Sequence, residues 1–359
     1  MTDRSAFQVA SDWPEPPDDS VVGTPDRVPG SVRRTATINI VWPDGWGTPM
    51  EQRGRCRDLL TPTEGEPIVL AEAGMRARVG DGRTVEEIEA WPVTRGDVSG
   101  LVGSQGGAKF RSAIDAVLPG EREAVTPLYF LLDDIAGCSL IGGFAWSRHR
   151  DGWGGPAEAR QLMTAAAVGA AQRAPQEIGM RKGKIICSGL RPGGYHQATR
   201  EAGVFDSHFL RVAGDLSSDD PWAWHEIEPP ADVMLRRRRR VDTWLEGDLI
   251  AVDAHFRDAV WEPDGTEMAL HEYTLQARVD RQSRQVTEIA AQPRVLPFPE
   301  CPGAAPHVAH LVGLPVGGFR TSVQDTLREL EACTHLNDML RCLAEVHTLA
   351  THLEGPALV

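Results

Sequence analysis

Two stretches of the sequence, about 200 positions apart, repeat the same order of side chains. The pairs that match at this offset, or at one position more, are Arg57 and Arg257, Asp58 and Asp258, Leu70 and Leu270, Glu72 and Glu272, Arg78 and Arg278, Val85 and Val286, and Ile88 and Ile289. A further match follows downstream, where Leu101-Val102-Gly103 and Phe110-Arg111 resemble Leu311-Val312-Gly313 and Phe319-Arg320. An offset shared by separate segments predicts an internal duplication. Each copy is expected to be a small antiparallel sheet followed by helices, so we predict an α+β fold in which the two copies pack as a pseudo-dimer.

The repeats divide the chain into four segments. Residues 1–30 are rich in Pro, Asp and Ser and are predicted to be a flexible N-terminal arm. Residues 31–141 form the first repeat, expected to be degenerate and structural, and residues 236–359 form the second repeat, expected to carry the site. Residues 142–235 are a connecting segment, with an Ala-rich helix predicted at residues 156–174.

Composition and charge argue against several classes of function. The formal net charge of −14 disfavours general affinity for nucleic acid, so no nucleic-acid partner is expected. The one basic run, Arg236–Arg240, leads into a strand pattern, which favours ion pairing within the protein over a nucleic-acid patch. No apolar run approaches the roughly 18 residues of a membrane span, and the acidic N-terminus is unlike a signal peptide. We therefore expect a cytoplasmic protein without a membrane partner.

Four side chains of the second repeat form the candidate site: Cys301, Cys333, His335 and His271. The chain has six cysteines, too few for a disulfide framework at this length, so thiols or metal ligands are expected. Thiolate and imidazole suit zinc or iron, which makes one of these metals the expected cofactor. Alternation along its strand pattern places His271 on an apolar, inward face. We assign His271, Glu272 and His335 as acid–base candidates.

The first repeat lacks the four candidate ligands, which suggests that they work together. Ala71 stands in place of His271, and Pro127 in place of His335. No tight C-x-x-C spacing supports the site, however. The alternative is that Cys333 is a small buried apolar side chain and that His335 caps or packs under its helix.

Other reactive side chains carry weaker signals. Cys187 is either a nucleophile at a strand end or a buried structural thiol, and the second is favoured. His307 and His310 are expected to be a solvated pair, and the repeated Arg57-Asp58 and Arg257-Asp258 are interpreted as structural ion pairs. The sequence has no Walker loop, GxGxxG, GxSxG or HExxH motif, so no nucleotide cofactor is expected.

The second repeat resembles a bacterial family known as domain of unknown function 2889, over about residues 236–350. The motifs that carry the resemblance are the Arg cluster before Val241-Asp242, His271-Glu272, Pro299-Glu300-Cys301, Leu311-Val312-Gly313-Leu314 and Cys333-Thr334-His335-Leu336. The family usually has His-Asp where this chain has His271-Glu272. The family name implies no activity.

A more distant similarity is to iron–sulfur scaffold proteins of the IscU/NifU type. In those proteins a small antiparallel sheet leads into a cysteine loop and then to helices with a later cysteine, and Cys301 and Cys333 occupy the corresponding places. The chain has no clear third cysteine between them. The resemblance therefore implies a zinc or single-iron site rather than cluster assembly.

Together these features predict a Cys/His metal or catalytic site in the second repeat. As an enzyme, the protein is expected to be a lyase, hydratase or isomerase that acts on a small organic acid or acyl compound. The alternatives are a non-catalytic metal-binding carrier or scaffold, and a protein-interaction module. A small-molecule substrate and an oligomer are both compatible with the sequence.

Overall fold

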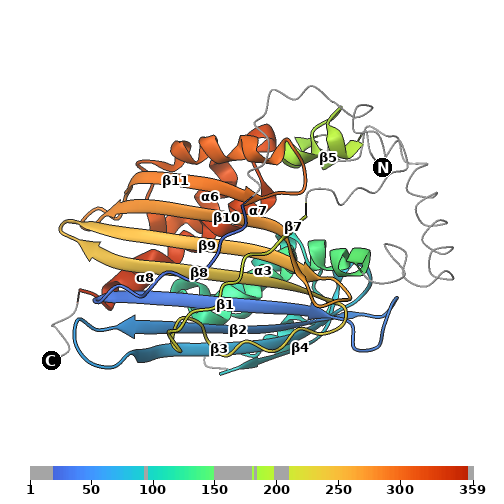
Figure 1. The fold of residues 1–359 in the computed structure, drawn as a ribbon, viewed down its shortest axis with the longest axis horizontal. Helices are drawn as coiled ribbons and strands as arrows, with labels where there is room; N and C mark the ends of the chain where they lie inside the picture. The colour runs from blue at the N-terminus through green and yellow to red at the C-terminus, as the bar shows by residue number, and fades with distance from the viewer. Residues whose placement is uncertain (1–18, 93–95, 149–179, 182–183, 198–209, 355–359) are drawn as a thin grey trace.

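One long antiparallel sheet runs through both halves of the chain (Figure 1). The computed structural model describes residues 19–92, 96–148, 180–181, 184–197 and 210–354. The strand order is β4-β3-β2-β1-β8-β9-β10-β11, and the short β7 pairs with β10. The strands are β1 (Ser31–Val41), β2 (Met50–Thr61), β3 (Ile68–Val79), β4 (Val85–Trp91), β7 (Arg211–Val212), β8 (Met234–Glu246), β9 (Leu249–Trp261), β10 (Glu267–Asp280) and β11 (Val286–Val295). The antiparallel α+β class predicted from the sequence is confirmed.

Helices cover one face of this sheet, the rear face in Figure 1. They are α1 (Ala108–Val117), α2 (Pro119–Glu123) and α3 (Pro127–Ile141) in the first half, and α6 (Phe319–Thr326), α7 (Thr334–Arg341) and α8 (Glu345–Thr351) in the second, with the 3₁₀ segment η8 (Cys301–Leu311) before α6. Alternate residues of the strands face the helices and form an apolar core in each half. In β1, for example, Ala36, Ile38 and Ile40 belong to this core, whereas Thr35 and Thr37 point to the opposite face.

The opposite face is covered by two extended segments, residues 19–30 and 210–233, which cross the front of the sheet in Figure 1. Ser20 donates to Glu272 at 2.6 Å, and Arg27 donates to Asp220 at 2.6 Å. The prediction of a flexible arm is therefore wrong for residues 19–30. Their polar groups are hydrogen-bonded to residues of the sheet and of the second segment. Since both faces are covered, every residue of β1 is buried. Residues 1–18 lie outside the described residues.

The two halves meet where β1 pairs with β8. On the helix face of this join, Arg34 makes two hydrogen bonds to Asp58 and a further one to Glu345 of α8. Arg237 makes two hydrogen bonds to Asp258, at 2.8 and 3.0 Å, and reaches Asp134 of α3 at 3.4 Å. Each arginine thus joins a strand of its own half to a helix of the other half. The basic run of β8 is engaged within the protein, as the sequence predicted.

The predicted ion pairs between Arg57 and Asp58, and between Arg257 and Asp258, are wrong. Neighbours on a strand point to opposite faces, so the two side chains of each pair cannot meet. Asp58 and Asp258 face the helices, whereas Arg257 pairs with Glu272 at 2.7 Å on the opposite face. Arg57 donates to the backbone oxygen of Trp222.

Irregularities of the sheet recur at equivalent places in its two halves. Leu70 is an extra residue in β3 opposite β2, and Leu270 is an extra residue in β10 opposite β9. Glu86 bulges in β4 and Thr287 in β11 in the same way. These bulges lie at the same offsets as the matching side chains of the sequence.

The connecting segment is only partly described. The Ala-rich helix predicted at residues 156–174 lies outside the described residues. Residues 184–197 begin with the short strand β6 (Lys184–Ile185) and continue into the 3₁₀ turn η7 (Ser188–Leu190). Among the described helices, Pro127–Trp146 has the length and composition of a membrane span, but 78% of its most apolar window is buried inside the protein.

We predict that Arg34→Met lowers the free energy of unfolding by about 3–5 kcal/mol, because it leaves Asp58 and Glu345 buried without their cation. The control is Arg278→Met, which removes a strand arginine from exposed ion pairs and should cost about 1 kcal/mol or less. Urea-induced unfolding of the three proteins measures both effects. Equal, small losses would show that the buried network does not join the halves.

Candidate functional site

Three side chains from different elements converge near the join: Asp258 of β9, His271 of β10 and His335 of α7. One ligand atom from each lies within 4.8 Å of the others. The imidazole rings of His271 and His335 stack with centroids 3.4 Å apart and an angle of 19° between their planes. Nδ1 of His271 lies 3.3 Å from a carboxylate oxygen of Asp258.

Local structure explains how each residue reaches this position. The extra residue Leu270 interrupts the pairing of β10 with β9, so that His271 comes to lie opposite Asp258 on the helix face. His335 is the second residue of α7, whose preceding residue, Cys333, is the N-cap. Asp258 and His271 are buried, and His335 is partly exposed.

The charges of the cluster follow from its surroundings. Burial lowers the pKa of His271 below its usual value, and burial together with the neighbouring His271 lowers that of His335 further. Burial by itself would raise the pKa of Asp258, but the Arg237 guanidinium outweighs it and holds that pKa below its usual range. At neutral pH the cluster therefore consists of two neutral imidazoles and one carboxylate.

One buried atom of the cluster is poorly satisfied. Nδ1 of His271 lies 3.3 Å from the Asp258 carboxylate, close enough for the two groups to shift each other's pKa, but the contact falls short of good hydrogen-bond alignment. A poorly satisfied buried nitrogen is costly unless something binds it more strongly. Neutral imidazoles and a carboxylate are the donors that zinc and ferrous iron use in proteins.

The structure does not bring Cys301 and Cys333 into this cluster. Both thiols are buried, and the hydroxyl of Tyr273 donates to Cys333 at 3.3 Å. Cys187 is also buried nearby, and Gly189 packs against the sulfur of Cys301. Among the described residues, no three of these sulfurs and other ligand atoms meet within 4.8 Å of one another. The predicted set of four ligands is thus divided, with the histidines in one place and the cysteines in another.

Burial also governs the chemistry of these thiols. It raises the pKa of Cys187 to about 12 and the pKa values of Cys301 and Cys333 above their usual value. A protonated, buried thiol is a poor nucleophile, which fits the structural role favoured for Cys187.

Glu272 lies on the opposite face of the sheet from His271, because the two are consecutive on β10. It is buried and accepts hydrogen bonds from Arg257, His255 and Ser20. Glu272 is therefore separated by the sheet from the other two acid–base candidates, His271 and His335, which lie together.

The remaining candidates, His307 and His310, lie at the surface. Their rings are 5.5 Å apart, and each has a nitrogen 3.9 Å from Glu331. His307 and Glu331 are partly exposed and His310 is exposed, which agrees with the solvated pair expected from the sequence.

Sequence reasoning missed Asp258 as a member of the site. Its counterpart Asp58 suggested a structural residue, and Asp258 does retain that role through Arg237. The signal that identifies it is the pairing of strands: with β9 and β10 in register, His271 stands opposite Asp258.

Comparison with known proteins gives a family without an assigned function. Residues 235–349 match the family model described as "Protein of unknown function (DUF2889)", which covers less than half of the chain. The resemblance of the second repeat to this family is thereby confirmed. No curated protein and no solved structure matches the chain, so the similarity to iron–sulfur scaffold proteins finds no support there.

We predict that iodoacetamide labels all six cysteines slowly in the folded protein, and that a chelator does not accelerate labelling of Cys301 or Cys333. The reason is that all six thiols are buried, so access rather than a bound metal limits the reaction. Peptide mass spectrometry with and without EDTA measures the rates, with Cys56 and Cys138 of the first half as internal controls. Selective release of Cys301 and Cys333 by EDTA would identify them as metal ligands.

Proposed function

We propose that the second half of the protein holds a divalent metal ion, zinc or ferrous iron, between Asp258, His271 and His335. The observation that carries this proposal is the convergence of a buried carboxylate and two neutral imidazoles, in which Nδ1 of His271 has only a poorly aligned contact with Asp258. A metal ion would give this nitrogen a stronger partner, and binding by both rings requires them to tilt out of their stacked arrangement so that their in-plane lone pairs converge.

The surrounding charges are compatible with a cation here. Arg237 is the nearest positive group, but its charge is shared among Asp258, Asp134 and Asp338. A divalent ion held by one carboxylate and two neutral rings keeps a net charge of about +1. An anionic compound therefore complements the loaded site, which favours the small organic acid expected from the sequence.

We propose further that this site supports lyase, hydratase or isomerase chemistry. A metal ion with two imidazole ligands and one carboxylate ligand can polarise a carbonyl group or activate a water molecule. His335 is partly exposed, and Asp258 is held by two hydrogen bonds from Arg237, so its carboxylate cannot rotate freely. A metal-binding carrier without turnover uses the same ligands and is the alternative that the experiment below separates.

We infer that the two halves arose by duplication and pack as a pseudo-dimer. The shared bulges and the equivalent pairs Arg34–Asp58 and Arg237–Asp258 support this inference. The first half keeps this framework but has Ala71 in place of His271. It would therefore act as a structural partner for the half that carries the site.

A cytoplasmic location is also proposed. It is supported by the six free thiols, since a reducing compartment preserves unpaired cysteines.

We predict that His271→Ala and His335→Ala each weaken zinc binding at least about tenfold, because each removes one of only three protein ligands. The protein is first stripped of metal with a chelator. Isothermal titration calorimetry with zinc, and with ferrous iron under anaerobic conditions, then measures the affinity and the stoichiometry of binding. His307→Ala is the matched control, because it removes a histidine from the surface group of His307, His310 and Glu331 and should leave this binding unchanged. Loss of zinc binding in His307→Ala alone would show that the metal binds to this surface group instead.

A second control separates the site from the core beneath it. Leu340→Ala should lower the free energy of unfolding by about 2–5 kcal/mol through a cavity under α7 while metal content is retained. If His335→Ala lowers stability as much and metal binding stays unchanged, His335 is a core residue and the proposal fails. A loaded protein that turns over none of a panel of hydroxy acids and acyl compounds would be a carrier.

A further inference from the structure

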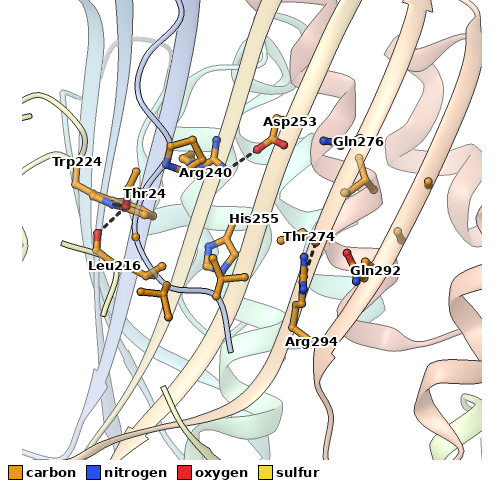
Figure 2. A pocket seen from close by; sticks show the side chains of 17 residues that line it. Thr24, Leu216, Trp224, Arg240, Asp253, His255, Thr274, Gln276, Gln292 and Arg294 are labelled. Atoms are coloured by element: carbon orange, nitrogen blue, oxygen red, sulfur yellow. Dashed lines mark hydrogen bonds and ion pairs between the residues drawn. The ribbon is translucent and has the colours of Figure 1, made fainter. Parts of the chain in front are cut away.

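A separate pocket of about 460 Å³ lies on the face of the sheet opposite to the helices (Figure 2). Its floor is formed by β8, β9 and β10, and one wall by β11. The segment at residues 21–25 forms the other wall together with Leu216 and Trp224. A volume of this size holds a small organic molecule.

The wall at residues 21–25 is fixed in place. The indole N–H of Trp224 donates to Thr24 at 2.8 Å, and Thr24 donates to the backbone oxygen of Leu216 at 2.6 Å (Figure 2). The backbone N–H of Val21 donates to Glu272 at 3.3 Å. These hydrogen bonds fix the position of the wall at residues 21–25 relative to the rest of the pocket.

The pocket contains one guanidinium whose charge is not neutralised. Arg240 is paired with Asp242 and Asp253. Arg294 donates through Nε to Thr274 at 3.2 Å, and no carboxylate of the described residues forms an ion pair with it. Figure 2 shows Arg294 beside Thr274 and Gln292 at the β11 wall. An anionic group in the pocket would pair with Arg294.

The floor offers an acceptor in His255. Nε2 of His255 contacts Glu272 at 2.7 Å, and Glu272 also accepts from Arg257 and Ser20. Because Glu272 acts as an acceptor, Nε2 carries the proton and Nδ1 keeps its lone pair. No described residue hydrogen-bonds to Nδ1, and the side chain lines the pocket. Burial lowers the pKa of His255 to about 4, so the ring is neutral at pH 7.

We infer that this pocket binds a small organic acid that carries a hydrogen-bond donor, a hydroxyl or an amine, in addition to its carboxylate. Arg294 pairs with the carboxylate, and Nδ1 of His255 and the carboxylate of Asp253 accept from the donor group. The apolar wall at Val21 and Leu216 packs against the carbon skeleton. The pocket is distinct from the proposed metal site, because His255 and Asp258 face opposite sides of the sheet.

The first half lacks the means to bind the same compound. Arg55 stands where the second half has His255, at the offset of 200 that relates β2 to β9. A guanidinium has no lone pair to accept from a donor group. The asymmetry between the halves thus extends to both faces of the sheet.

Calorimetric titration of the full chain with lactate, malate, serine and aspartate tests the inference. Propionate and succinate are the matched probes without the donor group, and inorganic phosphate is the probe for a plain anion site. We expect at least one hydroxy or amino acid to bind, and its analogue without the donor to bind at least about tenfold more weakly. Arg294→Gln and His255→Phe should each weaken that binding at least about tenfold, whereas Arg278→Gln, on the exposed side of β10, should not.

The inference is overturned if none of the four acids binds, if propionate and succinate bind equally well, or if phosphate alone binds. It is also overturned if Arg278→Gln weakens binding as much as Arg294→Gln. Thermal unfolding and zinc content of each variant are measured in parallel, so that a folding defect is recognised. The organic acid should still bind to protein stripped of metal and to the His335→Ala variant. Binding in the pocket is therefore tested independently of the proposed metal site.

Discussion

The structure depends on a set of buried arginine–carboxylate pairs at the join of β1 and β8. Arg34 and Arg237 each bind an aspartate of the next strand through two hydrogen bonds and then reach a carboxylate on a helix of the other half. Bidentate hydrogen bonding to a carboxylate fixes the orientation of a guanidinium. A buried charge that loses its partner is strongly destabilising. The two halves therefore cannot slide or separate without exposing these charges. An apolar join would tolerate other registers, whereas this one does not.

The same network explains why the candidate site lies near the join. Asp258 is held by Arg237 and is also the carboxylate beside His271. The first half keeps the corresponding pair, Arg34 and Asp58, without a histidine beside it. A framework carboxylate was thus available in both halves, and the second half differs by the two imidazoles placed against it. The pocket on the opposite face follows the same pattern, since His255 stands there at the position where the first half has Arg55.

The antiparallel strands and the α+β class could be predicted because alternation along a strand is a local property. The division of the candidate ligands could not, because His271, Cys301, Cys333 and His335 all belong to one half and spacing alone does not say which of their side chains meet in space. The partners of Asp58 and Asp258 were misassigned for a related reason: neighbours in sequence were paired, although strand geometry separates them and register decides the partner. The anchoring of residues 19–30 was missed because a polar, Pro-rich segment gives no sign of the polar sheet face that binds it. Its partners, such as Glu272, lie about 250 positions away.

The pairing of β1 with β8 has a consequence for synthesis of the protein on the ribosome. β1 is free to pair with β2 once both have left the exit tunnel, but its other neighbour is translated some 200 residues later. Until then β1 is an open edge of the sheet, and Arg34 lacks its ion-pair partner Glu345, which is translated near the end of the chain. Open edges template pairing with other chains. The charged and hydroxyl side chains of β1, which the finished protein buries, favour hydration of both faces of this strand during the interval.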